Sequence, residues 1–243
     1  MARHNDSRPR RELRSAMSLL GNAALAMWWN MASDMREDFE HWHSHEHFPE
    51  RLGIPGFHRS SRWTDVKGGE GIFVMYELES FDVLSSPPYL ERLNAPTPWS
   101  IKLMPHHRNM VRSQSHVLES CGGAVARNAL TIRFAPKREL EASLRQSLKA
   151  LIEDLPARPG ITGAHLLRHE TPSVAQTTEQ KIRGAADQVA DWVLVVCGYD
   201  ADAMQALKSF ELSERSLVSL GAEASQKCDL YSLSYSATPA DIH

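Results

Sequence analysis

In the first half of the chain, segments whose apolar positions are typical of strands alternate with segments whose apolar positions are typical of helices. Four runs rich in apolar, β-branched and aromatic residues are bounded by Gly, Pro, Asn or Asp and predict strands. Two segments with apolar residues at helical spacing lie between them and predict helices. The predicted strands are residues 23–31, 57–65, 71–78 and 106–118, and the helices are 38–47 and 81–94. Strand, helix, strand, strand, helix, strand is the order of a ferredoxin-like module.

The second half repeats this order. Ile54-Pro55-Gly56-Phe57-His58 is echoed by Ile161-Thr162-Gly163-Ala164-His165 where the first helix leads into the second strand. A polar insertion, residues 170–188, separates the second and third strands of this half and has no counterpart in the first. The predicted strands are 128–135, 161–165, 192–199 and 228–236, and the helices are 137–155 and 201–220.

The repeat predicts an α+β fold in which two tandem ferredoxin-like βαββαβ modules form an intramolecular dimeric α/β-barrel. Each module leaves one sheet face without helices, and pairing the two faces stabilises the fold by about 25 cal/mol per Å² of apolar area. We expect a disordered basic tail at 1–20 and an N-terminal module at 21–120 that holds the active site. A linker at 119–127 leads to a C-terminal module at 127–238, expected to be a structural partner.

Composition narrows the classes of partner. A formal net charge of -3 gives none of the broad positive field that dominates nucleic-acid affinity, so no nucleic-acid partner is expected. No apolar stretch is long enough to span a bilayer, so no membrane partner is expected. Three widely spaced cysteines without CxxC spacing indicate neither disulfides nor a thiolate zinc site and favour a cytoplasmic location. We expect a small-molecule substrate, with further homo-oligomerisation through module edges as an option.

A histidine-rich segment, residues 40–51, is the densest chemical signal. His43 to His47 matches HxxEH, in which two histidines one turn apart bind zinc, although zinc also needs a third ligand. Alternatively, Glu46 and His47 form an acid/base pair, because a histidine titrates near neutral pH. The third interpretation is a solvated helix face with Glu46 paired to Arg51 or Arg59. We prefer the acid/base pair and expect no metal; if one binds, its ligands are His43 and His47.

Other side chains are candidates for the same pocket because they are polar or aromatic and fall on the predicted strands or beside the second helix. Strand parity places Arg59 and His58 on opposite faces, so only one of them can line a given pocket. Tyr76 needs a hydrogen-bond partner if it is buried. The candidate substrate-binding residues are Trp42, His43, His58, His106, His107, Trp28, Trp29, Asn94 and Trp99.

The first half resembles the dimeric α/β-barrel superfamily, and within it an EthD-like group. The residues that carry this resemblance span 42–99 and are Trp42, Glu46-His47, Pro49 to Leu52, Ile54 to Phe57, Arg59, Tyr76 to Leu78, Ser85, Tyr89, Leu93-Asn94 and Pro96 to Trp99. The resemblance implies a pocket between sheet and helices, which the superfamily uses for cofactor-free monooxygenation, isomerisation, cyclisation, dehydration and decarboxylation. Similar sequences have an aromatic residue in place of His43, which argues against a metal.

These patterns and the resemblance lead to one preferred function and two alternatives. The preferred function is cofactor-independent acid/base chemistry of the lyase, decarboxylase or isomerase type on a small aromatic or polyketide-like carboxylate or carbonyl compound. In it His47 moves the proton, Glu46 sets its charge state, Arg59 holds an anionic group and Tyr76 donates a hydrogen bond. The alternatives are a cofactor-independent monooxygenase of phenols and a non-catalytic small-ligand-binding or stress protein.

Overall fold

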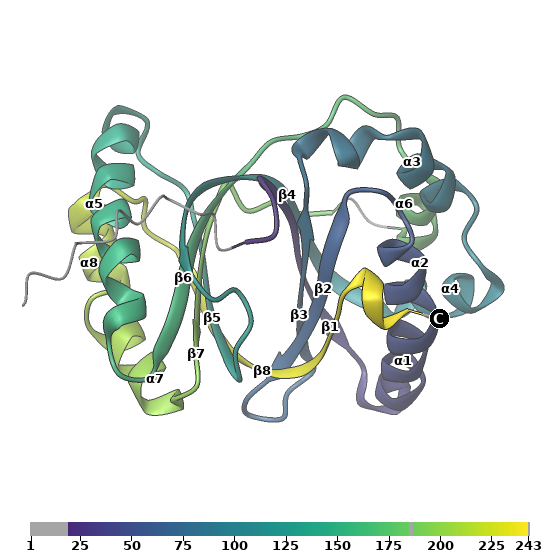
Figure 1. Cartoon of the computed structure of the whole chain (residues 1–243), viewed down its shortest axis with the longest axis horizontal. Coiled ribbons are helices and arrows are strands. Elements are labelled where there is room, and N and C mark those ends of the chain that lie inside the picture. Colours follow the sequence, from purple (N-terminus) through teal and green to yellow (C-terminus); the bar gives the residue numbers. More distant parts are fainter. Residues whose placement is uncertain (1–18, 185–186, 243) are drawn as a thin grey trace, which may run out of the picture.

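Eight antiparallel strands close into one barrel in the computed structural model, which describes residues 19–184 and 187–242 (Figure 1). The strand order around the barrel is β1-β3-β2-β8-β5-β7-β6-β4. This closed sheet confirms the expected α+β class and the tandem ferredoxin-like arrangement. The strands are β1 (Ala23–Met31), β2 (Phe57–Asp65), β3 (Gly71–Leu78), β4 (His107–Gly122), β5 (Asn128–Phe134), β6 (Ile161–His169), β7 (Trp192–Gly198) and β8 (Lys227–Ala237).

The two halves are joined edge to edge by the last strand of each. β4 pairs with β1 of its own half and with β6 of the other, whereas β8 pairs with β5 and with β2. The two sheet faces that lack helices therefore become the barrel interior, as expected from their apolar patterns. Further homo-oligomerisation through module edges stays a prediction.

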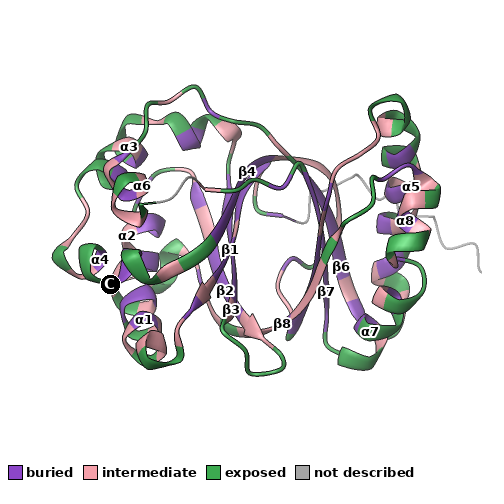
Figure 2. Cartoon of the chain, turned by 180° about the vertical axis from the view of Figure 1, so that it is seen from behind, coloured by how far each residue is buried: buried purple, intermediate pink, exposed green. Residues whose placement is uncertain are grey.

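Helices cover the barrel on two opposite sides (Figure 1). Their exposed faces point outwards and their buried faces towards the strands (Figure 2). α6 belongs to the second half in sequence but packs with the helices of the first half, beside α3. The helices are α1 (Arg36–Trp42), α2 (Phe48–Leu52), α3 (Pro87–Asn94), α4 (Pro98–Leu103), α5 (Glu141–Asp154), α6 (Thr178–Arg183), α7 (Ala201–Ser209) and α8 (Glu214–Leu220). None of the described helices is long and apolar enough to cross a membrane.

Three helical details differ from the predictions. The expected helix at 81–94 is divided into a 3-10 turn, Phe81–Ser85, and α3, which has its prolines in the first turn where they cost no hydrogen bond. α4 lies in a segment expected to be loop, and the Thr97 side chain caps it by accepting from the Ser100 N–H. α6 lies in the polar insertion, where we predicted no helix.

The barrel interior is a separate aromatic and aliphatic core. The rings of Trp28 and Trp63 both stack on the ring of Phe73, and each centroid lies 5.1 Å from that of Phe73. A register shift between Phe57 and Arg59 reverses the parity of β2, so Phe57 faces the helices and Arg59 the interior. Trp28 and Arg59 therefore lie on the opposite face of the sheet from the first-half helices.

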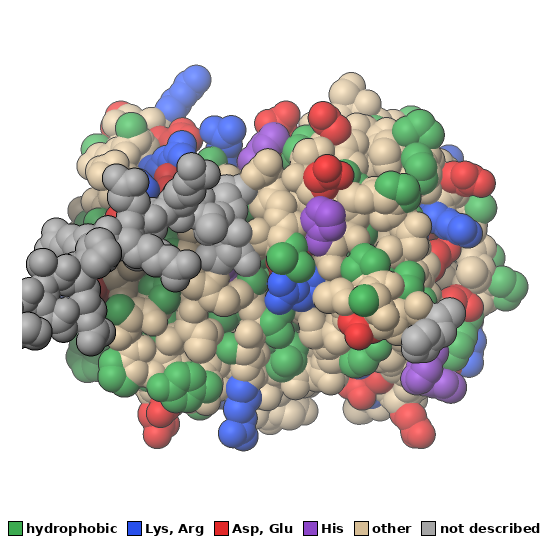
Figure 3. All heavy atoms as spheres, viewed as in Figure 1, with side chains coloured by type: hydrophobic (Ala, Val, Ile, Leu, Met, Phe, Trp, Pro, Cys, Tyr) green, Lys and Arg blue, Asp and Glu red, His purple; other side chains and the backbone are tan. Residues whose placement is uncertain are grey.

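Most of the predicted basic tail, residues 1–18, lies outside the described residues. Leu19 and Leu20 of that predicted tail are placed against the barrel: Leu19 is buried in the interior core, and the Leu20 N–H donates to the Glu77 carboxylate over 2.7 Å. Acidic and basic side chains are interspersed over the face shown in Figure 3, in keeping with the small net charge.

Candidate functional site

The histidine-rich segment folds as a π turn, His43–His47, between α1 and α2. Single π turns are uncommon and occur frequently at functional sites. This turn buries His43 and His47, which are 2% and 9% exposed, and their rings stack with centroids 5.3 Å apart. His41 and His45 lie on the outer side, where a ring nitrogen of His45 contacts the His41 carbonyl. The turn therefore separates the four histidines into an inner pair and an outer pair.

Two adjacent cavities lie between this turn and the outer faces of β1, β3 and β4. Their volumes are about 30 and 40 Å³. Five residues line both of them: Met27, His47, Tyr76, Glu179 and Arg183. His47 is thus the one predicted histidine that reaches both cavities.

Three imidazoles, those of buried His43 and His47 and of half-buried His107, line the second cavity and are held neutral. Burial lowers the pKa of His43 and of His47 well below the ordinary 6.5, helped for His43 by His47 and for His47 by Arg51. Burial also lowers the pKa of His107 to about 4, against a smaller opposite effect of the Met104 carbonyl. The Nδ1 atoms of His43 and His47 have no hydrogen-bond partner among the described residues. Both imidazoles are therefore unprotonated at neutral pH and have a ring nitrogen without a described partner, and the same burial makes them weak bases.

These pKa shifts predict that the protein loses stability below pH 6.5. A histidine whose pKa is lower in the folded than in the unfolded chain binds fewer protons when folded, so unfolding becomes easier as the pH falls from about 6.5 towards 4. Each such group, for example His107, contributes about 1.4 kcal/mol per pH unit within that window. Urea unfolding at pH 7 and pH 5 measures the effect. His107→Gln is the control, because it removes one titrating group and should flatten the dependence; an unchanged slope would contradict the assignment.

Guanidinium groups surround the first cavity. Arg51 is 3% exposed and forms an ion pair with Glu179, and one of its nitrogens lies 3.4 Å from Glu50. Burial opposes ionisation of Arg51, but Glu179, Tyr89 and Glu50 together raise its pKa above the ordinary value. Arg112 donates to the Tyr89 hydroxyl over 2.9 Å. The site therefore places guanidinium groups beside neutral imidazoles, and two of these groups, Arg51 and Arg183, are paired with the carboxylates of Glu179 and Asp187.

Tyr76 lines both cavities, as expected for a pocket residue. It is 2% exposed, and its ring meets Phe48 and Phe57 edge to face. Burial raises the pKa of its hydroxyl above the ordinary value, so the group is a neutral hydrogen-bond donor at physiological pH. Its role as a donor to substrate stays a prediction.

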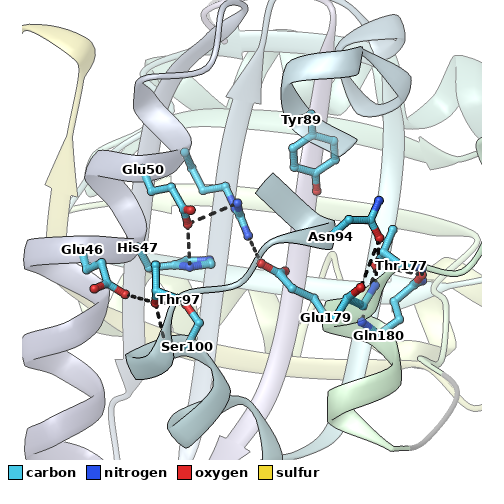
Figure 4. A network of polar contacts seen from close by, with 12 residues as sticks. Glu46, His47, Glu50, Tyr89, Asn94, Thr97, Ser100, Thr177, Glu179 and Gln180 are labelled. Carbon is cyan, nitrogen blue, oxygen red and sulfur yellow. Dashed lines mark hydrogen bonds and ion pairs between the residues drawn. The ribbon is translucent and has the colours of Figure 1, made fainter. Parts of the chain in front are cut away.

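Glu46 does not contact His47, which corrects the expected pair. Its carboxylate accepts a hydrogen bond from the Trp42 indole, at 3.0 Å. It also accepts one from the Thr97 hydroxyl (Figure 4). The nearest acidic group to His47 is Glu50, whose oxygen lies 3.9 Å from Nδ1, and burial raises the pKa of Glu50. Glu46 therefore positions the aromatic wall of the site and does not set the charge state of His47.

The alternative pairings considered for Glu46 are also absent among the described contacts. Arg51 pairs with Glu179, and Arg59 pairs with Glu77 over 3.2 Å inside the barrel. Arg59 thus cannot hold an anionic group in this cavity, because the sheet separates them. Trp28 is excluded for the same reason.

The remaining candidates divide between the cavity and its surroundings. Trp29, Trp42, His43 and His107 line the second cavity. His58 is half-buried at the β2 bulge, and His106 is exposed; neither lines the cavities. Trp99 donates to Asp38 on the outer side, and Asn94 accepts from the Thr178 N–H at the start of α6.

Two cavity-lining side chains come from the segment that the sequence analysis described only as a polar insertion. Glu179 and Arg183 lie on α6 and line both cavities, so the second half is more than a structural partner. The Thr177-x-x-Gln180 capping box is the signal that could have revealed α6. No local pattern indicates which surface such a short helix covers.

Zinc would need a third ligand beside His43 and His47. No group of three His, Cys, Asp or Glu side chains able to hold a metal ion is found among residues 19–184 and 187–242. The third ligand that the HxxEH interpretation requires is therefore not supplied by the described part of the chain. The expectation that the protein uses no cofactor stays a prediction.

Solved structures share the fold across almost the whole chain. A candidate monooxygenase from Fusobacterium nucleatum subsp. nucleatum ATCC 25586 matches with a TM-score of 0.60 at 10% identity, covering 90% of this chain and 96% of the other. An anthrone oxidase-like protein matches with a TM-score of 0.59 at 8% identity, covering 93% and 96%. A candidate monooxygenase from Lactobacillus acidophilus NCFM matches with a TM-score of 0.56 at 10% identity, covering 90% and 97%.

No family model and no curated protein matches the sequence, so the EthD-like resemblance is not confirmed. At these identities the likeness of the solved structures is one of fold. The expected lyase, decarboxylase or isomerase activity is corrected, because the three similar structures are described as monooxygenases or oxidase-like and none as a lyase, decarboxylase or isomerase.

Proposed function

We propose that the first-half cavity is the active site of a monooxygenase that oxidises an electron-rich phenol with molecular oxygen. The observation that carries the proposal is the buried Nδ1 of His47, a neutral nitrogen without a hydrogen-bond partner among the described residues, in a cavity flanked by guanidinium groups. The oxidase and monooxygenase descriptions of the similar structures support it.

The proposed reaction begins with proton transfer from the phenol to His47. Phenols are weak acids in water, and a nearby guanidinium charge favours the phenolate. Arg112 lines the first cavity and can supply this charge, whereas Arg51 and Arg183 are already paired with Glu179 and Asp187. The phenolate gives electrons to oxygen, and a bond forms between a ring carbon and one oxygen atom. In the net reaction a ring C–H and the phenol O–H become two C=O groups; the other oxygen atom leaves as water. The substrate supplies all the electrons, so the equation is phenol plus O2 to quinone plus water.

The aromatic wall of the cavity has a matching role. Trp29 and Trp42 line the second cavity beside the imidazoles. They would offer ring faces and edges to an aromatic substrate once the two small cavities, of about 30 and 40 Å³, are enlarged to admit it. Tyr76, neutral and buried, would donate a hydrogen bond to the phenolate oxygen. These contacts would orient the ring while the site excludes water, which strengthens each charge interaction.

Oxygen uptake with 1-naphthol tests the proposal. The expected result is one O2 consumed for each 1,4-naphthoquinone formed, with one atom of labelled oxygen in the product and one in water. His47→Gln is the matched control, because glutamine keeps the polarity but does not take up a proton. Binding of 1-naphthol with no uptake above that of the variant would contradict the proposal and favour the non-catalytic ligand-binding alternative.

A further inference from the structure

The insertion of the second half forms the outer wall of the first-half cavity. Its helix α6 is held at its start by Asn94 of α3, whose side-chain oxygen accepts from the Thr178 N–H over 3.1 Å (Figure 4). Thr177 and Gln180 form a capping box within the helix. A helix of six residues has little stability of its own, so its position depends on a few such contacts.

Three side chains of α6 face the interior: Ile182 packs against the first-half core, Arg183 lines both small cavities, and Glu179 brings a buried carboxylate. This side chain is 4% exposed, lines both small cavities, and pairs with Arg51 across 128 residues of sequence. Arg51 is otherwise near Glu50 and over the face of Tyr89, with 5.8 Å to the ring centroid. The first half thus buries the guanidinium group of Arg51, and the short helix α6 of the other half supplies its chief counter-charge, Glu179.

A larger chamber adjoins the small cavities on the outer side of α6. Its volume is about 230 Å³, and it shares Leu93, Arg112, Thr177 and Gln180 with the first small cavity. A cavity needs on the order of 150 Å³ to hold benzene, so neither inner cavity admits an aromatic ring as it stands. Thr177 and Gln180 lie where the larger chamber meets the first small cavity, and Glu179 lines the inner cavities beside them. An outward shift of α6 would therefore join the spaces.

We propose that, in the absence of ligand, the Glu179 carboxylate occupies the position on Arg51 that an anionic group of the ligand takes when it binds. The ligand is then an aromatic hydroxy acid whose carboxylate exchanges with that of Glu179 as α6 moves outward, while its ring enters the joined chambers. The exchange keeps one anion on Arg51 and transfers the Glu179 carboxylate to water, so no buried charge is left unpaired. This inference deepens the proposed function and rests on it for what happens to the ring, although the exchange itself is a binding event.

Binding of two matched probes to Glu179→Gln tests the exchange. The probes are 1-hydroxy-2-naphthoate and its neutral analogue 1-hydroxy-2-naphthamide, measured by calorimetry without turnover. Removing the competing charge should tighten naphthoate binding by about tenfold or more and leave naphthamide binding within about twofold. Ser173→Ala, an exposed change in the same insertion, should alter neither affinity. Naphthoate binding that is unchanged or weaker in Glu179→Gln, or an equal gain for both probes, would overturn the proposal.

Hydrogen exchange on the unaltered protein decides the question should Glu179→Gln fail to fold. Naphthoate should speed exchange of the amides of residues 178–183, because the ligand displaces their anchor, whereas naphthamide should not. Unchanged or slower exchange with naphthoate would reject the displacement. The two proposals fail separately: absent oxygen uptake with 1-naphthol removes the proposed reaction only, and uptake without probe discrimination removes the role of Glu179 only.

Discussion

His47→Gln is expected to lower the rate of oxygen uptake with a phenol at least about 100-fold, the usual contribution of a positioned general base. The physical reason is that His47 lines both small cavities and is unprotonated at physiological pH, because burial lowers its pKa. Charge stabilisation of the phenolate in the site must offset this lowered basicity for the ring nitrogen to take the proton. Glutamine has a similar size but cannot accept that proton. The measurement is kcat from oxygen-electrode traces at saturating substrate, with circular dichroism to verify folding.

His45→Gln is the matched control for this change. His45 belongs to the same π turn and is exposed, with its ring against the His41 carbonyl outside the cavity. Its replacement should leave kcat within about twofold, as for a surface change away from the site. A His47→Gln protein that keeps more than about a tenth of the activity would assign the proton transfer to another group.

Arg51→Met is expected to lower the free energy of unfolding by about 3–5 kcal/mol, the cost of breaking a buried ion pair from one side. The substitution leaves the carboxylate of Glu179 inside the protein without its cation. Changing both residues, Arg51→Met with Glu179→Met, should restore much of the loss, because an apolar pair needs no desolvation of charge. Urea unfolding of the single and double variants measures both effects.

The surface pair Arg108 and Glu70 provides the comparison. Its atoms lie 2.6 Å apart, but the two side chains are 51% and 44% exposed. Arg108→Met should therefore cost no more than about 1 kcal/mol. If Arg51→Met and Arg108→Met lower the free energy of unfolding equally, burial of the Arg51–Glu179 pair does not strengthen it. If the double variant does not regain stability, Arg51 stabilises the fold by contacts other than that with Glu179.

The strands and their order could be predicted from local patterns, because side chains alternate between two faces and each run is bounded by turn residues. β1 and β3 begin and end at the predicted residues. The π turn could not be predicted, since the same residues fit regular helical spacing. The bulge at Arg59 could not be predicted either, and one inserted residue was enough to place that arginine inside the barrel instead of in the site.

Within the site, the sequence indicated His43, His47, Tyr76 and Trp42 through their density and their place on predicted elements. Tertiary structure changed the partners of these groups. Glu46 is one residue from His47 in the chain yet bonds to Trp42 and Thr97, because side-chain direction on the turn decides which groups meet.

Local periodicity was sufficient for the architecture of this protein, since burying two apolar sheet faces leaves few arrangements for two βαββαβ units. The composition of the active cavity was decided by the tertiary structure. Arg51 and Glu179 are 128 positions apart and meet only because β4 and β8 close the barrel and bring the insertion over the first half. Contacts at such separation depend on the whole fold, so no short stretch of sequence contains them.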